Sequence, residues 1–225
     1  MVALKNTLLT MLSALLLCVT MLAAIIYGTG TSPELMQALM LHTASPDQTG
    51  LPAEQYAPMA EMITDYLKGN GSFQLVFYEN GTEYTAFNQK EQHHMADVQQ
   101  LFLLCSHVSL GSAILTLAGW LTTPRKPAFW RIVRRTVCCV LAYVTILVLL
   151  AVLDFNSLFI LFHKVAFTND LWLLDPRTDL LIRLMPIEFF VSYAAIIGGL
   201  WLLGVAGLLV FATIRIKKLK ANEGE

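Results

Sequence analysis

The chain has 225 residues, of which 56% are hydrophobic and only 14% are charged, and its formal net charge is -1. In soluble domains about a quarter of all residues are charged, so this composition excludes an ordinary soluble globular protein. It is typical of a protein embedded in lipid.

Four apolar runs are long enough to cross a bilayer, which takes about twenty residues per helix. They are residues 8–27, 98–121, 136–153 and 189–214. The first run is longer than the apolar region of a signal peptide and has a poor cleavage pattern, so we predict a retained anchor. A lipoprotein signal ending at Cys18 is disfavoured because three leucines precede this cysteine.

The basic residues predict the orientation, because short loops rich in Lys and Arg stay in the cytoplasm. They gather in residues 123–135 and 215–225, so we predict that both of these segments and the N-terminal tail are cytoplasmic. The predicted organisation is a tail and first span (1–27), an extracytoplasmic segment (28–97), a second span (98–122), the basic loop (123–135), a third span (136–153), a second extracytoplasmic segment (154–186), a fourth span (187–214) and the tail (215–225).

The first extracytoplasmic segment has the pattern of a small α+β head. Residues 58–68 have a helical apolar period that Gly69 ends, since glycine accepts the left-handed conformation after a helix. In the stretch that follows, Phe73, Leu75 and Phe77 alternate with Gln74, Val76 and Tyr78, and Asn80–Gly81 separates it from residues 83–87. This pattern predicts a β-hairpin.

Polar residues also gather where each extracytoplasmic segment meets a span. Residues 89–98 predict a helix continuous with the second span, on which Glu91, His94 and Asp97 share one face. Residues 155–167 are apolar but too short to span, which predicts an interfacial helix. They are followed by a dense polar and aromatic group: Asn169, Asp170, Trp172, Asp175 and Asp179. The predicted fold class is therefore an all-α membrane protein with four transmembrane helices, the small head and this interfacial helix.

Several kinds of chemistry lack their motifs. The four cysteines, which all lie within predicted spans, offer no extracytoplasmic disulfide or thiol nucleophile: Cys18, Cys105, Cys138 and Cys139. A G-x-S-x-G elbow is absent, and His93 and His94 near Glu91 do not form an H-E-x-x-H motif. We predict neither a metal site nor another cofactor.

His94 and His163 are the candidate catalytic residues, because the predicted topology places both at the level of lipid ester groups. Histidine titrates near neutral pH and carries protons in acyl chemistry, so lipid ester chemistry is indicated.

Two motifs resemble one family. Residues 94–98 (HMADV) and residues 162–167 (FHKVAF), followed by Asn169, Trp172 and Asp175–Pro176, resemble the lipoprotein intramolecular transacylase (Lit) family of small bacterial integral membrane proteins. The resemblance implies an acyltransferase of the bacterial cytoplasmic membrane that acts at the outer leaflet. It moves the sn-2 acyl chain of a diacylglyceryl-modified lipoprotein to the α-amino group of its N-terminal cysteine, which gives a lyso-form lipoprotein without an acyl-enzyme or added acyl donor.

The implied catalytic pair is His94 and His163, and which of them is the base stays open. Asp97 is expected to orient His94. The expected supporting or substrate-binding residues are Tyr84, Glu91, Asp97, Asn169, Asp170, Trp172, Asp175 and Asp179. The expected partners are diacylglyceryl-modified lipoproteins and membrane lipids, with no nucleic acid. Two alternatives stay open: a non-enzymatic membrane protein that binds or senses a partner, and a metal-dependent lipid hydrolase, which chelators would inhibit.

Overall fold

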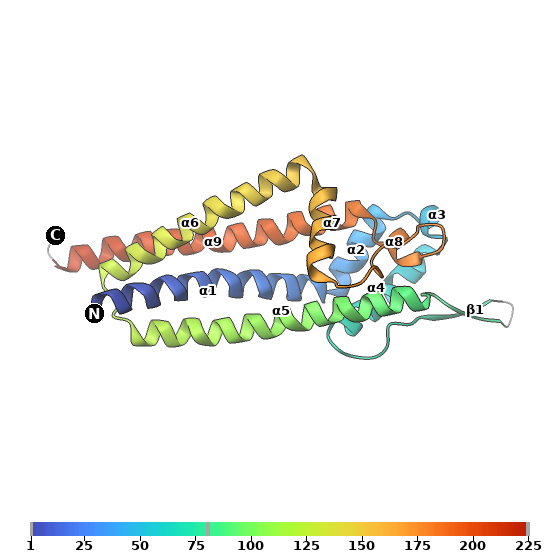
Figure 1. Ribbon diagram of the computed structural model, residues 1–225, viewed down its shortest axis with the longest axis horizontal. Helices are drawn as coiled ribbons and strands as arrows, with labels where there is room; N and C mark the ends of the chain where they lie inside the picture. Colours follow the sequence, from blue (N-terminus) through green and yellow to red (C-terminus); the bar gives the residue numbers. More distant parts are fainter. Residues whose placement is uncertain (1, 80–81, 224–225) are drawn as a thin grey trace. The chain divides into compact units, whose positions relative to one another are not determined.

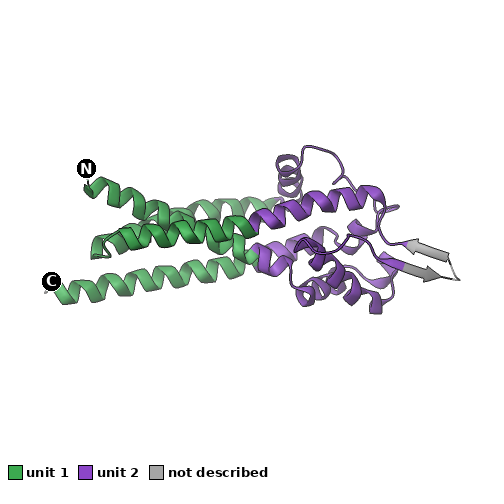
Figure 2. Cartoon of the chain, turned by 90° about the horizontal axis from the view of Figure 1, so that it is seen from below, with its two compact units in different colours: residues 1–25, 106–153, 197–225 green, residues 26–105, 154–196 purple. Residues whose placement is uncertain are grey.

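The computed structural model describes residues 2–79 and 82–223, and for residues 77–79 and 82–84 it describes the backbone alone. This part of the chain is almost entirely helical (Figure 1). The prediction of four membrane-spanning helices is confirmed: α1 (Val2–Gly30), α5 (Gln89–Thr122), α6 (Pro127–Leu153) and α9 (Ile187–Glu223). The chain divides into two compact units, which Figure 2 colours separately.

The first unit comprises residues 1–25, 106–153 and 197–225, and it contains most of the apolar length of the four long helices. Its core joins α1, α6 and α9 through buried side chains that include Cys18, Val133 and Trp201. The Trp201 indole donates a hydrogen bond to the Cys18 carbonyl (3.0 Å), and the Thr20 and Ser112 hydroxyls lie 2.7 Å apart. Such polar contacts and close packing hold helices together in lipid, where apolar burial alone gives little preference.

The start of α5 confirms the prediction that residues 89–98 are helical and continuous with the second span. A reciprocal capping arrangement begins the helix: the Asn88 backbone N–H donates to Glu91 Oε2 (2.8 Å), and the Glu91 N–H donates to Asn88 Oδ1 (3.1 Å). These bonds satisfy backbone groups that have no partner inside the helix. The helix therefore begins well before its apolar run.

The second unit comprises residues 26–105 and 154–196 and contains the shorter elements. A helix is present at the predicted position 58–68, beginning two residues earlier, and Gly69 follows it with a φ of +91°. The elements besides the ends of the long helices are α2 (Pro33–Thr43), α3 (Pro46–Thr49), the 3-10 helix η1 (Ala53–Gln55), α4 (Tyr56–Leu67), β1 (Val76–Glu79), β2 (Thr82–Thr85), α7 (Phe155–Ala166) and α8 (Leu180–Leu184).

The strands β1 and β2 pair in antiparallel register, with Val76 opposite Thr85. The Asn80–Gly81 turn, on which the hairpin prediction rests, lies outside the described residues. The turn itself therefore stays a prediction.

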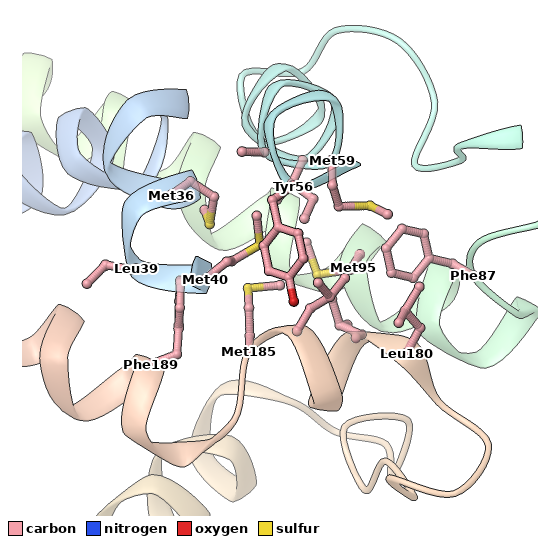
Figure 3. Packing of buried hydrophobic residues seen from close by; sticks show 14 of the residues in the cluster. Met36, Leu39, Met40, Tyr56, Met59, Phe87, Met95, Leu180, Met185 and Phe189 are labelled. Carbon is pink, nitrogen blue, oxygen red and sulfur yellow. The ribbon is translucent and has the colours of Figure 1, made fainter. Parts of the chain in front are cut away.

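The core of the second unit surrounds Tyr56, which is fully buried at the start of α4. Its hydroxyl donates to the Ala44 carbonyl (2.7 Å) and lies 2.9 Å from the Thr49 hydroxyl. Figure 3 shows flexible methionine side chains around the ring, among them Met95 of α5. Methionine side chains fill irregular gaps between helices. The core thus packs α2, α4 and α8 against Met95, the residue next to His94.

Candidate active site

The structure brings His94 of α5 and His163 of α7 together. Their ring centroids lie 6.1 Å apart, and each residue is only 7% exposed. Helical packing turns both imidazoles away from solvent, although histidine is usually only partly buried. Two proton carriers thus share one enclosed place.

The hydrogen bond of His163 defines its tautomer. Nδ1 lies 2.7 Å from the Phe159 carbonyl, one helical turn earlier in α7. A carbonyl oxygen only accepts, so Nδ1 carries the hydrogen and donates it. In the neutral ring Nε2 then keeps its lone pair, and this nitrogen is the one that can accept a proton.

His94 has a different environment. Its Nδ1 atom is buried and has no hydrogen-bond partner among the described residues. Its ring packs edge-on against Phe167, with centroids 5.2 Å apart. Asp97, which is expected to orient His94, forms no hydrogen bond with this ring in the described part of the chain. The Asp97 carboxylate instead accepts from the side-chain amide of Asn169 (2.9 Å), because Asn169 can reach α5 from the segment that follows α7.

Aromatic rings surround the His163 imidazole. Phe159, Trp172 and Phe167 lie 4.2, 5.0 and 5.5 Å from it between ring centroids. Burial among these rings lowers the pKa of His163 below its ordinary value of 6.5, although the bond to the Phe159 carbonyl acts in the opposite direction. The site therefore favours a neutral imidazole.

We expect the His163 ring to be mostly neutral at pH 6.5 in the folded protein. A group whose pKa is depressed by folding stabilises the fold above its unfolded value and loses that contribution as the pH falls. The nitrogen-15 NMR shifts of labelled imidazoles, titrated between pH 8 and pH 4 and assigned with a His163→Gln variant, measure this. A His163 ring that is half-protonated at or above pH 6.5 would contradict the expectation.

Glu91 is 1% exposed, and its carboxylate links two helices. Besides the Asn88 N–H, it accepts the Leu181 N–H at the start of α8 (2.6 Å). Asp179, also buried, accepts from the Asn88 side-chain amide (2.9 Å) and from the Asp175 N–H (2.8 Å). Burial alone would raise the pKa of Asp179, but these hydrogen bonds lower it overall. Both carboxylates hold the segment after α7 against the start of α5.

The remaining predicted residues lie in different surroundings. Asp170 is exposed and lines a cavity of about 420 Å³, together with Trp172 and Asn169. Asp175 forms an exposed ion pair with Arg177 (2.6 Å), which holds the pKa of this carboxyl below its usual range. The side chain of Tyr84 lies outside the described part of the chain.

Two groups that shape the site were not predicted from the sequence. The Phe159 carbonyl orients His163, and nothing in an apolar helix marks one carbonyl among many. Asn88 was detectable, because an Asn three residues before Glu91 is the signature of a reciprocal helix cap. Within the described residues, no three His, Cys, Asp or Glu side chains are grouped so that they could hold a metal ion.

Comparison with known proteins identifies the family. The family model for "Lipoprotein intramolecular transacylase Lit" matches residues 9–190. The chain belongs to the Lit family. It is therefore a transacylase, and the recognition of this family from the two histidine motifs is confirmed. A search of curated protein sequences gives no match.

Solved structures of Lit from Bacillus cereus have the same fold. One superposes with a TM-score of 0.75 at 18% identity, covering 98% of each chain. A variant of that Lit in which a histidine is replaced by arginine gives 0.72 at 20% identity, covering 98% of this chain and 96% of the other. A variant with alanine at that histidine gives 0.72 at 20% identity and covers 97% of each. This multi-pass membrane protein thus has the Lit fold along nearly its whole length.

Proposed function

We propose that the chain moves the sn-2 acyl chain of a diacylglyceryl-modified lipoprotein to the α-amino group of the N-terminal cysteine of that same lipoprotein. The observation that carries this proposal is the enclosed pair of imidazoles, His94 and His163, in a chain of the Lit family. The product is a lyso-form lipoprotein with an N-acyl chain and an S-monoacylglyceryl group.

The proposed first step is attack of the amine nitrogen on the carbonyl carbon of the sn-2 ester. The α-amino group has a pKa of about 8 and must be neutral to attack. We assign His163 as the base, since its Nδ1 donates to the Phe159 carbonyl and Nε2 is left to accept the amine proton. This arrangement supports an order of roles that the sequence left open.

The second step breaks the ester bond to glycerol. The tetrahedral centre collapses, the C–N amide bond remains, and the glycerol oxygen leaves with the proton that the amine lost. His163 returns that proton to the departing oxygen, while His94, whose Nδ1 has no partner among the described residues, donates a hydrogen bond to the oxyanion. One ester is exchanged for one amide, so the reaction needs no water, acyl donor or reductant.

Proximity supplies much of the rate in this proposal. Amine and ester belong to one molecule, so they lose little further translational and rotational freedom when they react. In well-oriented intramolecular reactions this lowers the activation barrier by up to roughly 7–11 kcal/mol. The aromatic rings around His163 also keep water from hydrolysing the ester. An acyl-enzyme nucleophile is therefore unnecessary.

We further propose that the histidine pair lies at the outer leaflet of the bacterial cytoplasmic membrane, with both termini in the cytoplasm. The basic residues support this orientation, because they concentrate in residues 123–135 and 215–225. Exposed apolar residues of α7, such as Phe162 and Val165, support its role as an interfacial helix in contact with membrane lipids. In this orientation α4 with the paired strands belongs to an extracytoplasmic head.

Mass spectrometry of a lipoprotein tests the proposed function. Cells that lack other N-acylation activity are compared with and without expression of the chain. We expect the N-terminal lipopeptide to change from the diacylglyceryl form to the lyso form with no change in mass, and the fragment ions to place one acyl chain on nitrogen. An unchanged diacylglyceryl form despite membrane-inserted protein would overturn the proposal.

A further inference from the structure

A cavity of about 420 Å³ lies between α7 and the segment that follows it. Its lining includes Phe167 and Trp172, which both contact the His163 ring. A substrate whose reacting end lies at the histidine pair would therefore have its adjoining atoms beside this cavity. The volume lies in the usual range of small-ligand sites, about 300–1,000 Å³.

The polar lining of the cavity comes from two elements. Lys164 extends from α7, while Thr168, Asn169 and Asp170 belong to the following segment. Lys164 and Asp170 are exposed and oppositely charged, and neither side chain forms an ion pair or hydrogen bond within the described part of the chain. An acyl chain in this cavity would cover charged groups without offering them a partner, which is costly. A peptide backbone offers donors and acceptors to both.

We propose that this cavity binds the peptide segment that follows the lipid-modified cysteine, and that Lys164 and Asp170 determine its charge preference. The inference rests on the proposed function, which places the modified cysteine at the histidine pair. The protein part of the substrate must leave that place toward water, and a cavity that combines apolar side chains with the exposed polar groups of Lys164 and Asp170 provides this route. Lys164 attracts acidic side chains in the first residues after the cysteine, and Asp170 attracts basic ones.

Charge reversal tests the inference. Synthetic diacylglyceryl lipopeptides that carry Ser, Glu or Lys after the cysteine are converted by the purified full chain in lipid nanodiscs, and kcat/KM is measured by mass spectrometry. We expect Asp170→Lys to lower the Lys/Glu preference at least about fivefold and Lys164→Glu to raise it by a similar factor, because exposed charges interact only weakly through water. The rate with the Ser peptide gives the charge-independent reference for each variant.

The control is Asp47→Lys, which makes the same change of charge at an exposed position of α3. Equal preferences in all variants, or an equal shift with Asp47→Lys, would overturn the inference while lyso product still supports the proposed function. A dependence on acyl-chain length that changes in the Asp170 and Lys164 variants would also overturn it, because the cavity would then hold lipid. Absence of lyso product from the wild-type chain would overturn the proposed function, and this inference with it.

Discussion

Replacing His163 with alanine is expected to lower the rate of lyso-lipoprotein formation at least about 100-fold, because general base catalysis contributes roughly 10²–10⁴. The His94→Ala variant should lose a similar factor, since His94 is the one imidazole in ring contact with His163 among the described residues. The rates are measured with a synthetic lipopeptide and purified variants in nanodiscs.

The chain contains a matched control for these two variants. His93 is adjacent to His94 on α5 but is exposed, so His93→Ala removes an imidazole from the same turn without touching the pair. Its rate should stay within about twofold of wild type, because surface substitutions are usually nearly neutral. Activity retained by His163→Ala, or lost equally by His93→Ala, would contradict the assignment of the pair.

A fold defect must be separated from a chemical one in these variants. The pair is buried, so alanine leaves a small cavity and some loss of stability is expected. The conservative variants His163→Gln and His94→Gln keep most of the volume and a polar group but cannot exchange a proton near neutral pH. Inactivity of both glutamine variants at a wild-type unfolding temperature would assign the loss to proton transfer.

Much of the fold could be predicted from composition, because a run of about twenty apolar residues has few uses other than spanning a bilayer. The predicted topology, which placed His94 and His163 at the level of lipid ester groups, also pointed to a shared site. The contact of Asp97 with Asn169 could not be predicted, since it joins positions 72 apart through a segment without regular structure. A loop has no period from which a side-chain direction follows, so the partner of Asp97 could not be read from the sequence.

Glu91 likewise has one contact that the sequence predicts and one that it does not. Its bond to Asn88 follows from a local capping signature, whereas its bond to Leu181 joins positions 90 apart. The structure distinguishes a structural role from substrate binding more clearly than the sequence did. Both carboxylate oxygens are occupied by backbone N–H groups, and only 1% of the residue is exposed. We therefore assign Glu91 to positioning α5 and α8, and the assignment has a measurable consequence.

The Glu91→Ala variant is expected to lose about 2–5 kcal/mol of stability. Two N–H groups, the partly buried one of Asn88 and the buried one of Leu181, lose a charged acceptor, and each such bond is worth about 1.5–3 kcal/mol. The midpoint of thermal unfolding in detergent should fall on the order of 10 °C. Glu91→Gln keeps one oxygen as an acceptor, so its midpoint should lie between those of alanine and wild type.

The comparison with Glu61→Ala separates this effect from a general loss of charge, since Glu61 is an exposed residue of α4 in the same unit. Its unfolding midpoint should be unchanged.

Because Glu91 lies one turn before His94, the activity of Glu91→Ala should fall together with its stability and recover partly on cooling. A Glu91 side chain that bound substrate would behave differently: Glu91→Gln would raise KM at an unchanged unfolding midpoint, and that result would refute the positioning role.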